Sequence, residues 1–363
     1  MSKIVSVGIC PPPHVCTQQS IERFVSHLFE GSFKDLNRLL NVFTNGQIEK
    51  RHFAKGLEWF QEEHSFEERN ATYIDCAVSL GIEAIQNCLQ SERFLKEAVP
   101  MKEINAFFFV SSTGFATPTI DAKIMNALPF SSHTKRIPIW GLGCAGGAAG
   151  LSRAFEYCQA FPKEKVIVLA VELCSLTFQR NDRSKSNLIG TSLFADGVAC
   201  VLIAGDEASI PSSLSVLPVF RGSQSTLMKE SEKVMGWDIR NNGLNVIFSK
   251  DIPTIIRNWL RPNVIHFLRE KGIELSDISH FIAHPGGKKV LDVYEESLEM
   301  NKEQTRISFD VLKEYGNMSS ATLLYVLEKY LLQVNKPGQT DLLAALGPGF
   351  SSELLLVEWE EVG

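Results

Sequence analysis

A cysteine, a histidine and an asparagine of this sequence each stand where an apolar run gives way to a helical pattern. Cys144 lies in the glycine-rich stretch Trp140–Gly150, after the apolar run Arg136–Trp140 and before helical spacing from Leu151 to Ala160. At such a turn, unpaired N–H groups and the positive end of the helix dipole favour a thiolate over a thiol. Small neighbours let a substrate approach the sulfur closely. The stretch therefore predicts that Cys144 is a nucleophile.

Two other interpretations of this stretch stay open at this point. Cysteine is among the most buried residue types, so a cysteine is usually a small core residue. That is the default interpretation of the other cysteines, Cys10, Cys16, Cys76, Cys88, Cys158, Cys174 and Cys200. The glycines at 141, 143 and 146 also match a dinucleotide-binding turn, with Glu172 at the end of the next apolar strand as the candidate ribose-binding acid.

The second half of the chain repeats the order of elements in the first. Ile278–Gly287 and the predicted helix Lys288–Leu298 resemble Phe107–Gly114 and the helix after it. Tyr315–Ser320 and the following helical pattern resemble the Cys144 unit. Duplication on this scale predicts two similar α/β units, residues 1–207 and 208–363.

The duplication predicts that three chemically useful side chains converge. Corresponding strand-to-helix corners of two related halves can face one another, and Cys144, His284 and Asn317 stand at such corners. His284 would share a proton with Cys144 as a thiolate–imidazolium pair and later donate a hydrogen bond to an oxyanion. Asn317 would supply a neutral amide donor to the same charge. Singly, such a histidine is more often a core residue and such an asparagine a helix cap. Together at duplicated corners, they favour catalysis.

Composition narrows the class of protein. The chain has 363 residues, of which 44% are hydrophobic and 21% charged, as in ordinary globular enzymes. The net charge of −6 argues against a general nucleic-acid surface. The eight cysteines include no C-x-x-C pair and no zinc spacing with histidine, so we predict no metal site and reduced thiols, as in the cytoplasm. We predict no signal peptide and no transmembrane helix, because no apolar run reaches about 18 residues.

Five motifs together carry a family resemblance that extends over nearly the whole chain. They are Gly143-Cys-Ala-Gly-Gly147, Phe194-Ala-Asp-Gly197, His284-Pro-Gly-Gly287, Gly316-Asn-Met-Ser-Ser-Ala321 and Gly347-Pro-Gly349. This set resembles the chalcone and stilbene synthases, the type III polyketide synthases. The resemblance implies a thiolase-like, five-layered αβαβα fold built from two duplicated halves. It also implies a homodimer that condenses coenzyme A thioesters iteratively, with no further cofactor.

The resemblance also assigns roles to residues. Cys144 would be acylated by the starter, and His284 and Asn317 would promote decarboxylation of malonyl-CoA and hold the thioester carbonyls. Phe194 matches the gatekeeping phenylalanine, and Val246 stands where plant members have a second one. Further positions match substrate-binding residues, namely Cys174, Thr177, Ser112, Thr117, Ser319, Gly347 and Gly349.

Two features of the match bear on the substrate. The smaller side chain of Val246 leaves room for a bulkier or longer starter, so we expect a fatty acyl-CoA and alkylpyrone or alkylresorcinol products. Among the basic residues of the coenzyme A tunnel only Arg38 matches in charge. Lys50 and Arg51 are interpreted as part of a solvated face.

Two functions other than a type III polyketide synthase stay open. One is an initiating ketoacyl synthase, which stops after one condensation, and the other is a nicotinamide oxidoreductase.

Overall fold

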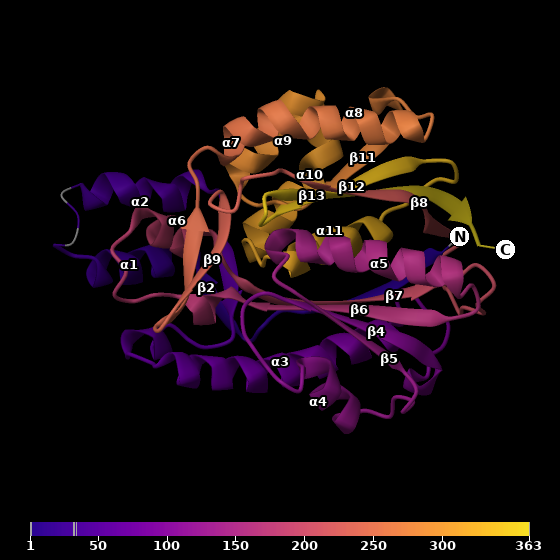
Figure 1. The fold of residues 1–363 in the computed structure, drawn as a ribbon, viewed down its shortest axis with the longest axis horizontal. Coiled ribbons are helices and arrows are strands. Elements are labelled where there is room, and N and C mark those ends of the chain that lie inside the picture. The colour runs from indigo at the N-terminus through magenta and orange to yellow at the C-terminus, as the bar shows by residue number, and fades with distance from the viewer. Residues whose placement is uncertain (1, 32, 34, 363) are drawn as a thin grey trace.

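The computed structural model describes residues 2–31, 33 and 35–362, which form five stacked layers (Figure 1). The described strands include a nine-stranded mixed sheet. Its order is β11 (Ile278–Ala283), β12 (Thr340–Gly347), β13 (Ser351–Glu361), β8 (Val216–Leu227), β1 (Lys3–Cys10), β7 (Asp196–Ala204), β6 (Lys165–Leu173), β4 (Ile104–Ser111) and β5 (Lys135–Trp140). Between β8 and β1 the strand register has one residue pair, Lys3 with Val219, so the sheet divides there into two layers.

The two parts of the sheet have the same pairing. In the first, β4 and β6 are parallel, and β7 joins β6 and β1 by antiparallel pairs. In the second, β11 and β12 are parallel, and β13 joins β12 and β8 by antiparallel pairs. The predicted duplication is therefore confirmed at the level of strand topology. The boundary between residues 207 and 208 stays a prediction.

Helices supply the other three layers. Helices α3 (Phe66–Leu89) and α4 (Ile120–Ala127) cover the outer face of the first sheet, and α5 (Gly146–Ala160) and α11 (Ser320–Leu331) lie between the sheets. The outer face of the second sheet carries α7 (Ile252–Ile255), α8 (Arg261–Glu270), α9 (Lys288–Leu298) and α10 (Lys302–Tyr315). None of the described helices is long and apolar enough to cross a membrane.

Smaller elements gather at one end of the layers, on the left in Figure 1. They are α1 (Gln18–Leu28), α2 (Leu36–Asn45), α6 (Lys185–Leu193), and the antiparallel pairs β2 (His14–Thr17) with β3 (Lys50–Phe53) and β9 (Met235–Arg240) with β10 (Gly243–Phe248). No helix was predicted over the residues of α6. Its N-cap is Ser184, whose side chain accepts a hydrogen bond from the Asn187 N–H.

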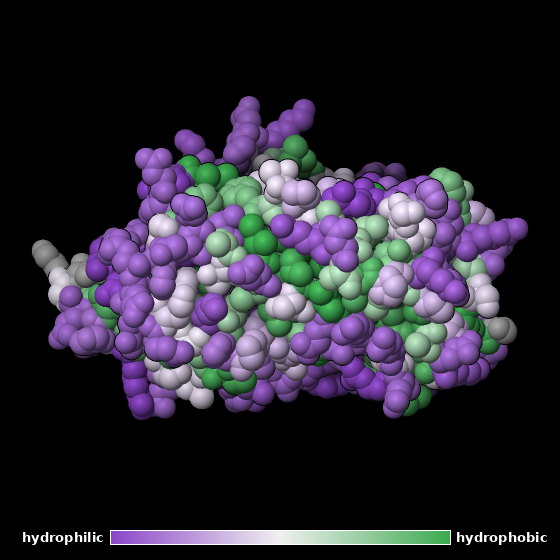
Figure 2. All heavy atoms as spheres, turned by 90° about the horizontal axis from the view of Figure 1, so that it is seen from below, coloured by the Kyte–Doolittle hydropathy of each residue, from purple (hydrophilic) through white to green (hydrophobic). Residues whose placement is uncertain are grey.

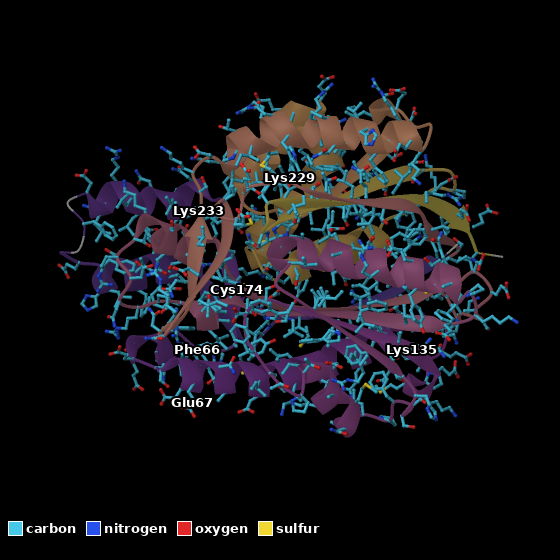
Figure 3. The ribbon with its side chains drawn as sticks, in the orientation of Figure 1. Phe66, Glu67, Lys135, Cys174, Lys229 and Lys233 are labelled. Carbon is cyan, nitrogen blue, oxygen red and sulfur yellow. The ribbon has the colours of Figure 1, made fainter. Side chains whose placement is uncertain are left out.

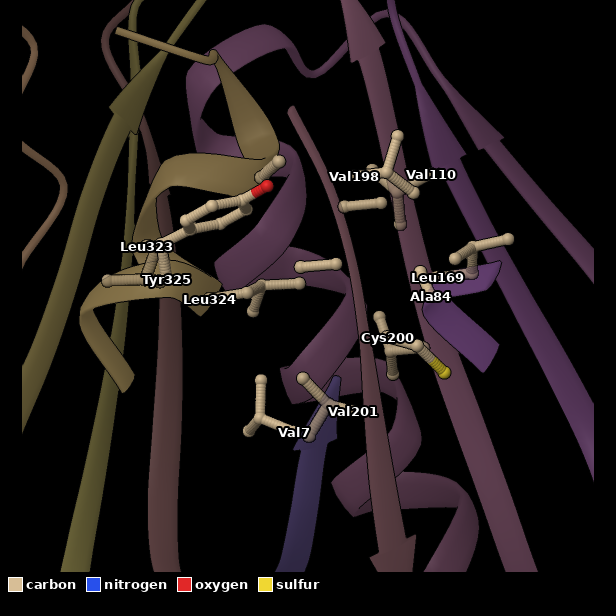
Figure 4. Close-up of a cluster of buried hydrophobic side chains, with 14 of the residues drawn as sticks. Val7, Ala84, Val110, Leu169, Val198, Cys200, Val201, Leu323, Leu324 and Tyr325 are labelled. Atoms are coloured by element: carbon tan, nitrogen blue, oxygen red, sulfur yellow. The ribbon is translucent and has the colours of Figure 1, made fainter. Parts of the chain in front are cut away.

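The core is continuous between the first sheet and the central helices (Figure 4). Val7, Leu169, Cys200 and Leu324 come from β1, β6, β7 and α11 and are all fully buried. Helix α5 begins at Gly146, five residues before the predicted start. The glycines reduce helix propensity, but a Cβ on Gly147 would lie 2.2 Å from the Ser320 carbonyl oxygen. Close packing of α5 on α11 therefore requires glycine there and overrides propensity.

Candidate active site

Cys144 lies on a short turn that packs closely against the turn Gly347-Pro-Gly349. It sits in the single 3-10 turn Gly143–Ala145, between β5 and α5, and is 7% exposed. Gly143 has φ +47° and donates its N–H to Ser112 Oγ at 2.9 Å. A Cβ on Gly143 would lie 2.7 Å from Pro348, and a Cβ on Gly347 would lie 2.5 Å from the Leu142 carbonyl oxygen. The Gly-Pro-Gly turn thus fixes the place of the sulfur.

Asn317 is held by its backbone and by its side chain. Its N–H donates to the Leu193 carbonyl at 2.9 Å, and its carbonyl accepts from the Ala195 N–H at 2.8 Å. Side-chain Oδ1 accepts from the Ser319 N–H at 2.8 Å, and Nδ2 donates to the Gly286 carbonyl at 3.1 Å. Because an amide nitrogen carries two protons, one of them stays available for a ligand.

The three predicted residues are linked by a short series of contacts. The Cys144 thiol donates to Asn317 Oδ1 at 3.9 Å. Asn317 bonds Gly286, and a Cβ on Gly286 would lie 3.7 Å from His284 Nε2. His284 follows β11, is 2% exposed, and is anchored by its N–H to the Ala344 carbonyl at 2.8 Å. Within the described part of the chain, both its ring nitrogens lack a hydrogen-bond partner, so one can accept a proton and the other can donate to a ligand.

Burial disfavours a charge on Cys144 or on His284 when only one of the two is ionised. It raises the pKa of the Cys144 thiol to about 12 and lowers the pKa of His284 to about 3. Burial thus outweighs the helix-dipole effect that the sequence led us to expect at Cys144. The thiol and imidazole can ionise together, by passing the thiol proton to the ring, because opposite charges in one dry site offset each other. The thiolate–imidazolium pair stays a prediction.

The dinucleotide interpretation of the glycines is wrong, because Glu172 is unavailable to a ribose. Glu172 is fully buried behind the Cys144 turn, where it accepts from the Ser112 N–H at 3.0 Å and the Ser320 hydroxyl at 2.5 Å. Burial raises its pKa to about 7. It is therefore an internal hydrogen-bond acceptor between the two halves.

Four of the predicted substrate-binding residues line one apolar cavity. They are Phe194, Val246, Cys174 (Figure 3) and Thr177. Phe178 also lines the cavity, together with side chains from α1, from β3 and from the residues after β3, namely Ile21, Phe24, Arg51, Phe53, Leu57 and Phe60. Its free volume is about 60 Å³, several times the roughly 10–15 Å³ that one water needs. Most of the side chains that line the cavity are apolar.

The other predicted substrate-binding residues lie elsewhere. Ser112, Ser319 and Gly347 touch the turns around Cys144 and Asn317. Gly349 ends the Gly-Pro-Gly turn with φ +131°. Thr117 is not part of the cavity wall within this chain, because it lines a separate groove with Tyr73, Phe115 and Trp140. The structure therefore does not support its assignment to the cavity of its own chain.

A second groove, of about 260 Å³, reaches the His284 corner from the surface. Gly286 and Gly287, which follow His284 closely in the chain, line this groove, and Lys250, Lys288 and Lys289 supply three cations. Arg38 is exposed and does not line it. Lys288 and Lys289 have a signal in the sequence, because they stand directly after His284-Pro-Gly-Gly287.

Arg51 is not part of a solvated face, so that sequence prediction is wrong. The side chain is 1% exposed, and burial lowers its pKa to about 9, which leaves it protonated at neutral pH. Nη1 donates to the carbonyls of Thr191 and Phe194, both at 2.7 Å. Only the three-dimensional structure reveals this, because the flanking Lys50 and His52 are polar and β3 is too short to give a clear alternation.

Comparison with known proteins agrees with this geometry. The sequence matches the N-terminal domain of chalcone and stilbene synthases over residues 1–207 and their C-terminal domain over residues 220–359. The chain belongs to the chalcone and stilbene synthase family. A protein of Bacillus subtilis (strain 168), provisionally named a chalcone synthase, is 51% identical over 363 residues, which cover 99% of this chain and 100% of that protein. The predicted family and enzyme class, a type III polyketide synthase and hence an acyltransferase, are confirmed.

More distant type III polyketide synthases share the fold. The 1,3,6,8-tetrahydroxynaphthalene synthase of Streptomyces peucetius subsp. caesius is 32% identical over 99% of this chain and 93% of its own length. The crystal structure of the 1,3,6,8-tetrahydroxynaphthalene synthase of Streptomyces coelicolor A3(2) superposes with a TM-score of 0.91 at 28% identity, covering 99% of this chain and 100% of the other. The predicted thiolase-like fold is confirmed. Enzymes of this family use coenzyme A thioesters as substrates.

Proposed function

We propose that this type III polyketide synthase extends a long-chain fatty acyl-CoA with malonyl-CoA and releases triketide or tetraketide alkylpyrones or alkylresorcinols. The observation that carries the catalytic assignment is the buried set of Cys144, His284 and Asn317. The sulfur lies 3.9 Å from the amide oxygen, and both imidazole nitrogens lack a partner among the described residues. These groups supply a nucleophile, a proton carrier and a fixed amide donor in one dry place.

The first step is transfer of the starter to the enzyme. The thiol proton of Cys144 passes to His284, and the thiolate attacks the carbonyl carbon of the acyl-CoA. The new carbon–sulfur bond forms as the bond to coenzyme A breaks, and the coenzyme A thiolate takes the proton back from His284. The product is a thioester of Cys144, and the imidazole is again neutral.

The second step makes the carbon–carbon bond. Malonyl-CoA loses carbon dioxide, and the electron pair left behind forms an enolate whose oxygen accepts hydrogen bonds from His284 and the free proton of Asn317 Nδ2. The carbanion attacks the acyl group on Cys144, and the sulfur leaves as a thiolate. Return of the extended chain to Cys144 permits another round. Attack of an enol oxygen on the thioester carbonyl closes a pyrone and releases the thiolate. Attack of a carbanion on a chain ketone closes a carbon ring, which becomes a resorcinol after loss of water, hydrolysis of the thioester and loss of carbon dioxide.

The apolar lining of the cavity supports the choice of starter. Burying each methylene contributes about 0.8 kcal/mol, so an apolar cavity favours an alkyl chain. Val246 and Phe194 lie on its wall, and a Cβ on Gly190 would lie 3.3 Å from both. The side chain at position 246 therefore controls how much of the cavity an acyl chain can use.

We assign the coenzyme A phosphates to the groove with Lys250, Lys288 and Lys289. Replacing Lys250 and Lys289 together by Glu should raise the KM for malonyl-CoA about tenfold at low salt, since each exposed charge contributes up to about 1 kcal/mol. The effect should shrink at high salt, because exposed charges are screened. Lys336→Glu, an exposed charge reversal remote from this groove, is the control. An unchanged KM would place coenzyme A elsewhere.

The homodimer and the cytoplasmic location also remain proposals. Strand β5 ends the described sheet, and its Trp140 is 46% exposed beside a groove of about 550 Å³ that also contains Phe115 and Thr117. Figure 2 shows apolar side chains gathered in a band across the face that carries α3 and α4. A second copy pairing along β5 would cover such an edge. Trp140→Asp should therefore shift sedimentation from dimer to monomer. Eight free cysteines fit a reducing compartment.

The catalytic assignment is tested by Cys144→Ala. The variant should form no polyketide but should still decarboxylate malonyl-CoA slowly, because His284 and Asn317 remain. Cys158→Ala, at a buried cysteine of α5, is the matched control and should retain condensation. Full condensation by Cys144→Ala would contradict the assignment. A single ketoacyl product made only from malonyl on a carrier protein would instead indicate an initiating ketoacyl synthase.

A further inference from the structure

The C-terminal end of α6 has its carbonyls satisfied by distant residues. The last carbonyls of a helix have no partner within the helix itself. Here Arg51 of β3 donates to Thr191 and Phe194, both at 2.7 Å, and Gln18 donates to Ser192 at 2.9 Å. A buried cation at this end also complements the helix dipole. Side chains of β3 and α1 therefore fix the position of the residues that follow α6.

Backbone groups at the end of α6 and directly after it also hold Asn317. The Asn317 N–H donates to the Leu193 carbonyl, and the Asn317 carbonyl accepts from the Ala195 N–H, so residues 193–195 and Asn317 form one bridge. Arg51 also touches the other side of this bridge. A Cβ on Gly316, which has φ +73°, would lie 2.8 Å from Arg51 Cγ. Arg51 therefore packs against both backbone segments that meet at Asn317.

We propose that Arg51 is a positioning residue that fixes the Phe194 gate and the Asn317 amide relative to each other. This inference rests on the roles proposed above for Cys144 and Asn317. A rigid planar guanidinium that bonds two carbonyls defines their separation in a way that a flexible ammonium does not. Cys144 lies on the turn before α5, and the described hydrogen bonds include none between its turn and residues 191–195.

The hydrogen bonding of Arg51 argues against a role in stability alone. Its Nε and Nη2 have no hydrogen-bond partner in the described structure. The buried carboxylate of Asp196 favours the cation through its charge, but it accepts its hydrogen bonds from Ala54 and Ser175. Burying a charge with unsatisfied donors is unfavourable, and an apolar residue of similar shape is often at least as stable. The need to place the carbonyls of Thr191 and Phe194 explains why a cation is retained at position 51.

The experiment separates the step that needs Asn317 from the step that does not. Acylation of Cys144 is followed by intact-protein mass spectrometry after one turnover with acetyl-CoA, whose short chain depends least on the cavity wall that Arg51 and Phe194 share. Decarboxylation is followed by carbon dioxide release from malonyl-CoA. Arg51→Met should lower kcat for decarboxylation about 10- to 100-fold, the effect of moving a catalytic group by about 1 Å, with KM nearly unchanged. Acylation should stay within about threefold of wild type. Arg51→Lys should restore part of the lost rate.

A matched control removes another arginine from a helix end. Arg261 donates to the Ser297 carbonyl at 2.6 Å near the end of α9, and Arg261→Met should lower thermal stability without changing the ratio of the two rates. An equal loss of acylation and decarboxylation in the Arg51 variants, in proportion to the folded fraction, would overturn the proposal, as would unchanged rates in both. If Arg51→Met does not fold, the ratio measured for Arg51→Lys decides. Condensation by Cys144→Ala would refute the proposed catalytic roles instead.

Discussion

Val246→Phe tests whether the apolar cavity limits the length of the acyl chain that the enzyme accepts as a starter. Val246 lies on β10 and lines the cavity with Phe194, and the cavity has only about 60 Å³ of free volume. A phenyl ring at this position would displace roughly three methylenes of a bound chain. At about 0.8 kcal/mol for each methylene, that is about 2.4 kcal/mol, or about 60-fold in kcat/KM.

The assay compares starters from acetyl-CoA to stearoyl-CoA with wild-type enzyme, Val246→Phe and Val246→Ile. The loss should grow with chain length, stay within about threefold for acetyl-CoA, and fall to about fourfold for Val246→Ile, which adds one methylene. Ile239→Phe is the control, because Ile239 lies on the same hairpin but is 55% exposed. A loss of equal size for every starter would refute the reasoning, since it would mean that position 246 affects the chemistry and not the fit of the chain.

Two further predictions concern the packing around Cys144. Glu172→Gln should flatten the pH dependence of stability. The pKa of the Glu172 carboxyl rises on folding from 4.5 to about 7. Its contribution to the free energy of unfolding is therefore present at low pH and is lost as pH rises. Between pH 4 and pH 8 the variant should gain about 3 kcal/mol in the free energy of unfolding relative to wild type. A parallel pH profile would contradict this. Gly347→Ala should lower kcat about tenfold or more, because its Cβ would displace the Cys144 turn. Gly338→Ala, at an open left-handed position, should reduce stability by about 1 kcal/mol and leave kcat unchanged; equal kcat in both variants would refute the interlocked turns.

Local sequence patterns predicted the elements that dominate the fold. The apolar run Arg136–Trp140 located β5, and the repeated order of units located the corners that carry Cys144, His284 and Asn317. Where prediction failed, tertiary packing had overridden local preference. Helix α5 contains Gly146, Gly147 and Gly150 despite their low helix propensity, because a Cβ at each would lie within 3.0 Å of a neighbouring element; Gly147 against Ser320 is the clearest case.

Functional residues without a local signal could not be predicted. Arg51 is flanked by polar residues, yet distant carbonyls at the end of α6 make it a buried cation. Glu172 would face a ligand only in the dinucleotide interpretation, and its partners Ser112 and Ser320 come from separate parts of the chain. Thr117 lies in a groove away from Phe194. In each case the side chain's environment is set by segments far apart in the sequence, which the spacing of residue types does not encode.

The most direct test of the account is the product spectrum of the purified wild-type enzyme. Malonyl-CoA is supplied with acyl-CoA starters from acetyl to stearoyl and with aromatic acyl-CoAs, and the products are identified by mass spectrometry. The account predicts triketide or tetraketide pyrones or resorcinols from long acyl chains, with little product from aromatic starters. Products from aromatic starters or from malonyl-CoA alone, with none from long acyl chains, would contradict it.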